Sequence, residues 1–323
     1  HTLDYVPVAR VGKRSPVADT MVARRLAVIE ALYRQRTKLA DAPQCHPWPG
    51  ESAISLAGVR DEGKPKTHLI PESVVVHLAR VAIDYVLGRA KSLLDARSLL
   101  DEASLAEQHR HPVHATIART RAARSLGFLG QEELAGELIR LRTACYIVIN
   151  LFVGIRDSEM KSLSDCSLVP GTTRDGVDVL WLHGTIYKTG IRKKRWLVPP
   201  IAKSAIEVLT ELTLPLRRAL DAELSQLERE NPAGHDPETA RRLAVVRNSI
   251  GKLFLGLGAK RKAIQVLTNA TMAGLLKDFC SHHGIVGANN KPYPLHSHQF
   301  RRTYAHYVAR AELGDLLMLR EHF

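Results

Sequence analysis

The amino-acid sequence predicts a mainly helical protein of the α+β class that carries one small antiparallel β-sheet. Apolar residues recur at helical spacing over most of the chain, and two short β-rich runs flank a cationic, turn-like segment in the second half. The chain has 323 residues, 45% of them hydrophobic. That length exceeds the roughly 250–300 residues at which one hydrophobic core stops growing, so we expect two domains.

The charge of the chain favours a polyanionic partner. Lys and Arg number 46 against 33 Asp and Glu, a net charge of +13, which would attract a nucleic acid or an acidic membrane surface. No apolar run approaches the roughly 18 residues of a membrane span, and the amino terminus lacks the layout of a signal peptide. We expect a cytoplasmic protein with no membrane partner.

The four cysteines are few and far apart. Cys45, Cys145, Cys166 and Cys280 include no Cys-x-x-Cys pair, so neither a disulfide framework nor a structural zinc site is indicated. We expect four free thiols.

Residues 1–111 are expected to form a helical amino-terminal domain preceded by an arm. Residues 1–16 mix basic residues with two prolines and show no period. Helical spacing runs over Val17–Leu39 and again over Pro71–Leu105, where the proline suits a first helical turn. Between them, residues 41–70 are rich in Pro, Gly and charge and are predicted to be irregular.

Residues 112–130 are expected to be a basic interdomain linker. The sequence here is punctuated by proline and dense in His and Arg, including Arg119, Arg121 and Arg124. Such a segment could pass over a nucleic-acid backbone. A solvated basic surface is the alternative.

Residues 131–323 are expected to form the second domain. Glu132–Phe152 is nearly continuously apolar, which indicates a helix buried on most sides, and Gly154 follows it. Val177–His183 and Arg195–Val198 are the predicted strands of the small sheet.

From about Ile201 to Phe323 the pattern is helical again, interrupted by Glu230–Glu238 and by Gly284–Pro294. Leu214–Val246, rich in Arg and Glu, is predicted to be an inserted helical pair. It could mediate contacts between protomers, but a solvated surface is the favoured interpretation.

Three separated elements of the second domain carry the strongest functional signal. They are Gly154-Ile-Arg156-Asp-Ser-Glu159, Lys188 between the predicted strands, and His298-Gln-Phe-Arg301 at the start of a later helix. In this order and context they resemble the tyrosine recombinases of the phage-integrase family. The run GIRDSEMKSL is similar to the family's Gly-Leu-Arg-x-Ser-Glu-Leu junction, and HQFRRTYAH is similar to its His-x-Leu-Arg-His-Thr-Phe-Ala helix. The resemblance covers about residues 138–323.

The resemblance implies a site for phosphoryl transfer. Arg156 and Arg301 would clamp the nonbridging oxygens of a scissile phosphate, because planar guanidinium groups meet such oxygens bidentately. His298, one turn before Arg301, would donate a hydrogen bond or move the nucleophile's proton. Lys188 would protonate the leaving 5′-oxygen, and Glu159 would orient the cationic groups without reacting.

The helical amino-terminal domain, residues 1–111, is expected to bind the DNA, and further cationic residues are expected to contact it. No metal or cofactor is expected, because the cationic side chains take the metal's place and the phosphotyrosine link conserves the bond energy. The predicted DNA contacts are Arg119, Arg121, Arg124, Arg192, Lys193, Lys194 and Arg302.

These assignments have simpler alternatives. Arg156 could complement the dipole at a helix end. Lys188 shares its loop with Lys193 and Lys194, and its spacing differs from the family's Lys-Gly-x-x-x-Arg form. The stretch around His298 could bind zinc, although no third ligand is evident.

The end of the chain departs from the family pattern. In the family a last His or Trp and the nucleophilic Tyr follow the His-x-x-Arg element by a few tens of residues, and this sequence reaches Phe323 before them. Tyr187, Tyr304 and Tyr307, like the other tyrosines, are not expected to substitute. We expect the segment with the nucleophile to lie beyond these residues and the chain alone to be inactive.

The expected function is site-specific recombination of duplex DNA. A Tyr would attack a phosphate to give a 3′-phosphotyrosine and a free 5′-hydroxyl, with a dimer on one site and a tetramer joining two. Integration, excision or resolution of a mobile element would fit, in association with the nucleoid. The alternatives are a type IB topoisomerase or telomere resolvase, a catalytically inactive DNA-binding regulator of the same fold, and a basic helical scaffold for RNA.

Overall fold

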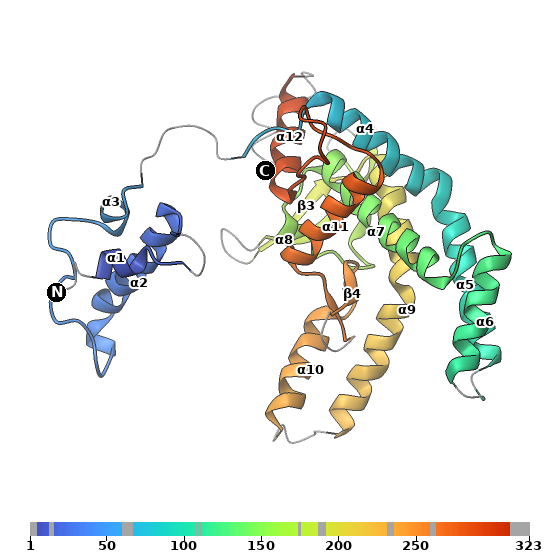
Figure 1. Ribbon diagram of the computed structural model, residues 1–323, viewed down its shortest axis with the longest axis horizontal. Helices are drawn as coiled ribbons and strands as arrows, with labels where there is room; N and C mark the ends of the chain where they lie inside the picture. The colour runs from blue at the N-terminus through green and yellow to red at the C-terminus, as the bar shows by residue number, and fades with distance from the viewer. Residues whose placement is uncertain are drawn as a thin grey trace. The chain divides into compact units, whose positions relative to one another are not determined.

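The computed structural model contains two compact units, His1–Lys66 and Thr67–Phe323. It describes residues 5–12, 16–59, 67–107, 109, 112–173, 176–186, 192–230, 236–258 and 263–310. Helices make up most of the described chain, and the strands pair in antiparallel fashion (Figure 1). The predicted fold class is confirmed.

The first unit is a small helical body around one tryptophan. It contains α1 (Tyr5–Ala9), α2 (Asp19–Arg34), a 3-10 turn (Arg36–Lys38) and α3 (Ala53–Leu56). The buried indole of Trp48 donates to the carboxylate of Glu30 at 2.6 Å, and the same carboxylate accepts from the backbone N–H of Ala53 at 2.8 Å. These bonds lower the pKa of Glu30 and fasten the irregular segment to α2. The predicted arm therefore includes a helical turn, α1.

The second unit is built around the buried helix α7 (Gln131–Val153), which the sequence predicted to within one residue at each end. Its buried positions fall on all sides, so it packs against α4, α5, α9, α11 and α12. Before it come α4 (Glu72–Ile83), a π-helical segment (Asp84–Arg89), α5 (Ala90–Ala106) and α6 (Pro112–Ser125).

The contacts divide the chain at Lys66, not at the expected linker 112–130. Residues 112–125 of that expected linker form α6, which packs on α5 and α7. The physical reason lies in α4 and α5, whose buried side chains, including Leu78 and Leu94, belong to the same core as α7. The sequence shows that α4 and α5 have apolar faces, but it does not show that α7 is the helix that covers them.

The sheet has three strands in the order β1 (Leu168–Thr172), β2 (Asp178–Ile186) and β3 (Arg192–Leu197). Strands β2 and β3 correspond to the two predicted ones, but β3 begins at Arg192. Arg192–Lys194, expected in the cationic turn, therefore belong to the strand, because they pair with Gly184–Ile186 of β2. The sequence did not reveal β1, because Pro170 and Gly171 are typical of a loop. Both are tolerated because β1 pairs only with β2, and Gly171 leaves room for the ring of Trp181 beside it.

The last third contains α9 (Pro200–Glu230), α10 (Pro237–Ser249), α11 (Asn269–His282) and α12 (Ser297–Arg310). The far half of α9 lies beside α10, as the predicted helical pair requires (Figure 1). Between α10 and α11, β4 (Leu255–Leu257) pairs with β5 (Ile264–Val266). Three-residue strands are too short to produce a visible alternation, so they were not predicted.

Two further observations bear on the expectations from composition. All four cysteines are free thiols, as predicted. Among the described helices, none combines the length and the apolar character that a membrane crossing requires.

Candidate anion-binding site

The site is set up where the buried helix α7 ends. Gly154 terminates that helix in the left-handed conformation, with φ 66°, and its N–H donates to the carbonyl of Asn150 at 3.1 Å. A Cβ at this position would overlap the ring of Tyr304. Glycine is therefore needed twice here, for the backbone conformation and for the close approach of α12.

Arg301 lies one turn before Tyr304 on α12, so the same approach brings it to the end of α7. Its Nη1 donates to the carbonyl oxygen of Gly154 at 3.2 Å. Arg156 follows Gly154 by two residues in the chain. The hydrogen bond from Arg301 to Gly154 therefore places Arg301 beside the segment that carries Arg156.

Glu159 holds the two arginines. It lies in the short helix α8 (Asp157–Met160), where its Oε2 accepts from the backbone N–H of Arg156 at 2.8 Å and its Oε1 from the Nη1 of Arg156 at 2.7 Å. The Nη1 of Arg301 is 3.7 Å from Oε2. The carboxylate side chain is only 1% exposed, whereas the side chains of Arg156 and Arg301 are 29% and 18% exposed.

A second carboxylate, that of Asp157, anchors helix α8 to its neighbours. Asp157 accepts from the buried hydroxyl of Tyr146 at 2.7 Å and from the Nζ of Lys161 at 2.6 Å. Burial, and then the neighbouring Asp157, raise the pKa of Tyr146, so its phenol stays protonated. Asp157 and Lys161 balance each other, and the charge of this pair does not offset the arginines.

The cluster carries more positive charge than its one carboxylate neutralises. Burial, and then the neighbouring Arg156, lower the pKa of Arg301 to about 10, while Glu159 opposes that shift. The guanidinium therefore stays charged at neutral pH. Partly exposed guanidinium groups above a buried carboxylate form a site to which an oxyanion can bind with bidentate hydrogen bonds.

The predicted site residues are distributed unevenly around this cluster. Arg156, Glu159 and Arg301 are brought together. His298 is exposed on the first turn of α12, one turn before Arg301. Lys188 lies outside the described residues.

The predicted DNA contacts occupy three places. Arg302 is engaged inside the fold, where its Nη1 donates to the carbonyl of Thr67 at 2.6 Å. On α6, Arg119 pairs with Asp101 at 3.4 Å, Arg124 donates to the carbonyl of Leu129 at 3.2 Å and Arg121 is exposed. Strand β3 carries the rest, Arg192, Lys193 and Lys194.

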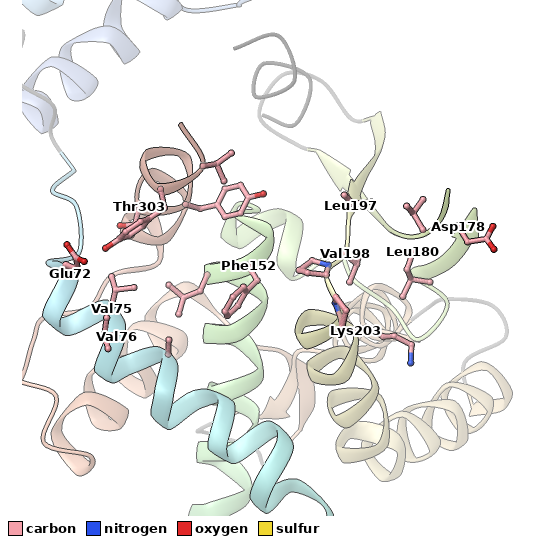
Figure 2. A pocket seen from close by; sticks show the side chains of 18 residues that line it. Glu72, Val75, Val76, Phe152, Asp178, Leu180, Leu197, Val198, Lys203 and Thr303 are labelled. Carbon is pink, nitrogen blue, oxygen red and sulfur yellow. The ribbon is translucent and has the colours of Figure 1, made fainter. Parts of the chain in front are cut away.

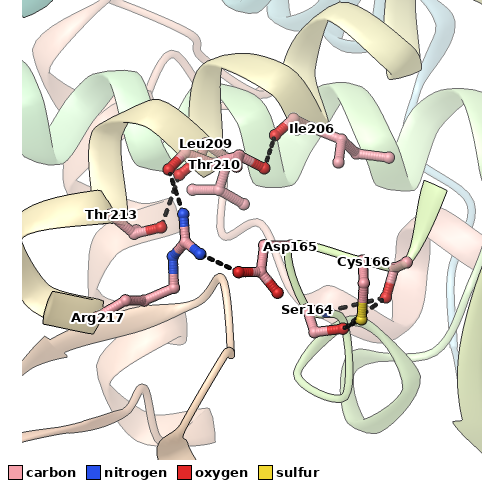
Figure 3. A network of polar contacts seen from close by, with 9 residues as sticks. Ser164, Asp165, Cys166, Ile206, Leu209, Thr210, Thr213 and Arg217 are labelled. Carbon is pink, nitrogen blue, oxygen red and sulfur yellow. Dashed lines mark hydrogen bonds and ion pairs between the residues drawn. The ribbon is translucent and has the colours of Figure 1, made fainter. Parts of the chain in front are cut away.

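Another arginine of the same unit is used entirely differently (Figure 3). Arg217 of α9 pairs with Asp165, and its Nη2 donates to the carbonyl of Thr210 at 2.9 Å. Nearby, Pro215 leaves the carbonyl of Glu211 without its helical donor, and Arg97 donates there at 3.4 Å and to the carbonyl of Leu212 at 2.6 Å. Arg97 and Arg217 therefore stabilise α9 near Pro215 by donating hydrogen bonds to its carbonyls.

A large cavity of this unit has mostly apolar walls (Figure 2). It has a volume of about 990 Å³ and lies between α4, α7, α12 and the sheet, with walls that include Val75, Phe152, Leu180 and Tyr307. Arg156, Glu159 and Arg301 do not line it. Walls of this kind do not suit a phosphate.

Sequence reasoning missed two glycine contacts that shape the site. One is the contact of Gly154 with Tyr304, and the other is Gly184, which lets β2 approach the end of α8. A glycine inside an otherwise regular strand was the available signal for the second.

No protein-family model matches the chain, and no curated protein sequence matches it either. Among the described residues, no group of three or more His, Cys, Asp or Glu is placed to hold a metal ion.

Proposed function

We propose that the second unit binds the phosphate backbone of duplex DNA through Arg156 and Arg301, and that the protein is a site-specific recombinase of the tyrosine type. One observation supports this proposal most directly. Two partly exposed guanidinium groups, Arg301 of α12 and Arg156 at the start of α8, converge on the buried carboxylate of Glu159. The motif resemblance and the net charge of +13 support a nucleic acid as the source of the phosphate.

In this proposal the arginines hold the two nonbridging oxygens of one phosphate. A tyrosine hydroxyl gives up its proton, with His298 as the group to move it, and attacks the phosphorus. The bond to the 5′-oxygen breaks as that oxygen takes a proton from Lys188, so that a 3′-phosphotyrosine and a 5′-hydroxyl result. Glu159 fixes the guanidinium planes, and His298 is near enough along α12 to act on the same phosphate. A dimer would occupy one DNA site and a tetramer would join two.

Selection of duplexes from a random-sequence library tests the first part. The wild-type protein is expected to enrich a defined duplex, and Arg301→Gln is expected to enrich none. Arg140→Gln is the matched control, because Arg140 is also a half-buried arginine paired with a shared carboxylate, Glu137, at 2.6 Å. Equal enrichment by both variants would contradict the proposal.

The second part is tested with the full-length protein, including the segment that is expected to carry the nucleophilic tyrosine. The selected duplex, nicked near its centre, is incubated with this protein, and the mixture is then denatured. A DNA-protein adduct that survives denaturation and disappears in Arg156→Gln is the expected result for a recombinase. Binding without any adduct would point to a DNA-binding regulator of the same fold. Relaxation of supercoiled DNA that carries no selected site would point to a type IB topoisomerase.

A further inference from the structure

Two neighbouring lysines of β3 point to opposite faces of the sheet. Lys194 pairs with Gly184 of β2, and Trp196 pairs with Leu182. Paired residues share a face, and side chains alternate along a strand, so Lys194 lies on the face of the buried Trp196. Lys193 lies on the other face and is exposed.

The outer face is identified independently by a ring contact. The guanidinium of Arg195 lies over the ring of Trp181, 4.5 Å from its centroid. Arg195 is exposed and alternates with Lys194 along the strand, which places Lys193 and Arg195 together on the outer side.

Gly184 lets the inner face approach the arginine cluster. A Cβ on Gly184 would stand 2.9 Å from the ring of Trp196 and 3.1 Å from the Oγ of Ser162. That hydroxyl accepts from the N–H of Thr185 at 2.9 Å and donates to the carbonyl of Glu159 at 2.6 Å. A single serine therefore ties β2 to the residue that holds the two arginines.

Lys194 pairs with Gly184, and the charges of the arginine cluster affect the pKa of Lys194. Burial, and then the neighbouring Arg301, lower its pKa, with Arg192 and Arg156 acting in the same direction and Glu159 opposing them. The side chain is half-buried, and among the described residues it forms no ion pair. It is thus a cation held close to three others, Arg192 of its own strand and the two arginines of the cluster, without a carboxylate of its own among the described residues.

We propose that Lys194 is the third cationic group of the anion-binding site and contacts the same phosphate as Arg156 and Arg301. The inference rests on the proposed function, since the phosphate is that of bound duplex DNA. It assigns different roles to the two lysines. Lys194 contacts the phosphate, whereas Lys193, on the outer face, contributes at most a long-range charge.

The test compares Lys194→Gln with Lys193→Gln, alone and combined with Arg301→Gln, in titrations of a fluorescent duplex at several salt concentrations. Lys194→Gln is expected to weaken binding about ten- to a hundredfold, the size of a lost charged hydrogen bond. Lys193→Gln is expected to weaken it only a few fold. In the Arg301→Gln background the effect of Lys194→Gln should shrink, because contacts to one phosphate are coupled.

The outcomes separate the two claims. If Arg301→Gln leaves binding unchanged, the proposed function fails. If Arg301→Gln weakens binding but Lys194→Gln does no more than Lys193→Gln, only the role of Lys194 is overturned. Additive losses for Lys194 and Arg301 would also overturn it, because they would place Lys194 on a different phosphate.

A second measurement applies even if Lys194→Gln does not fold. In the wild-type protein, duplex DNA is expected to protect Lys194 from amine acylation more strongly than Lys193, as read by peptide mass spectrometry. Equal protection of the two lysines would contradict the inference. Lys194→Arg, which keeps the charge, should fold and should retain most of the affinity.

Discussion

Two arginine-carboxylate clusters in the same unit show how the setting decides what an arginine does. Arg217 meets Asp165 one to one, gives a second hydrogen bond to a helix carbonyl, and its side chain is 9% exposed. Arg156 and Arg301 share one carboxylate that is almost fully buried, and both remain partly open to solvent. The charges of the first cluster balance each other, whereas the second carries two guanidinium groups on one carboxylate and so has an excess of positive charge.

The comparison predicts the largest effect at Glu159. Replacing it with Gln removes the carboxylate that pairs with both guanidinium groups, so the free energy of unfolding should fall by about 3–5 kcal/mol, as for a broken buried ion pair. Urea denaturation measures this change. The control is Glu207→Gln, since Glu207 and Lys203 form an exposed pair worth no more than about 1 kcal/mol. Equal losses of stability for the two variants would contradict the role of Glu159 as the ion-pair partner of both arginines.

Gly154→Ala comes next, because Gly154 positions both arginines. The left-handed conformation should cost about 1–2 kcal/mol, and displacement of the Tyr304 ring about 1–3 kcal/mol more. Gly176→Ala is the control, since Gly176 has φ 78° but open space around its missing Cβ. It should show the conformational cost alone. If the two variants unfold at the same urea concentration, the contact with Tyr304 is not tight.

Arg217→Met should separate stability from binding. It leaves Asp165 without its partner, and because the Asp165 side chain is 40% exposed, the expected loss is about 1–3 kcal/mol in the free energy of unfolding. Duplex affinity should not change. A loss of affinity in a variant that is still folded would show that the balanced cluster also serves the ligand, which would break the comparison.

At neutral pH the smallest effect is expected from a half-buried histidine that carries no charge, His283. Burial, and then the adjacent His282, lower the pKa of His283 to about 4 in the folded protein, against 6.5 for the free side chain. Since the unfolded chain binds the proton more readily, stability should fall as the pH drops from about 6.5 toward 4. His283→Gln should flatten that dependence in urea titrations, and His77→Gln, at an exposed position on α4, should not.

The sequence predicted those parts of the fold that depend on local pattern. The apolar residues of α7 marked its length, and the two β-rich runs on either side of a turn-like segment marked β2 and β3. The boundary near Lys66 could not be predicted, because it depends on which core covers α4 and α5. Strand β1 was missed because Pro170 and Gly171 obscure it.

The site was predictable only in part, for a similar reason. The motifs named Arg156, Glu159 and Arg301, and the structure brings them together. The different roles of Lys193 and Lys194 depend on strand register, which adjacent identical residues do not reveal. Arg217 was assigned to a solvated insertion, yet it is buried, because only the folded chain brings Asp165 to it.

The central claim is tested most directly by the salt dependence of duplex DNA binding in Arg301→Gln and Arg140→Gln. Each phosphate contact contributes about 0.9 to the slope of log affinity against log salt, so Arg301→Gln should reduce the slope by about one unit. Arg140→Gln, which removes the same charge from a pair with Glu137, should leave the slope unchanged. Identical slopes for the two variants would mean that the Arg156 and Arg301 cluster does not contact DNA.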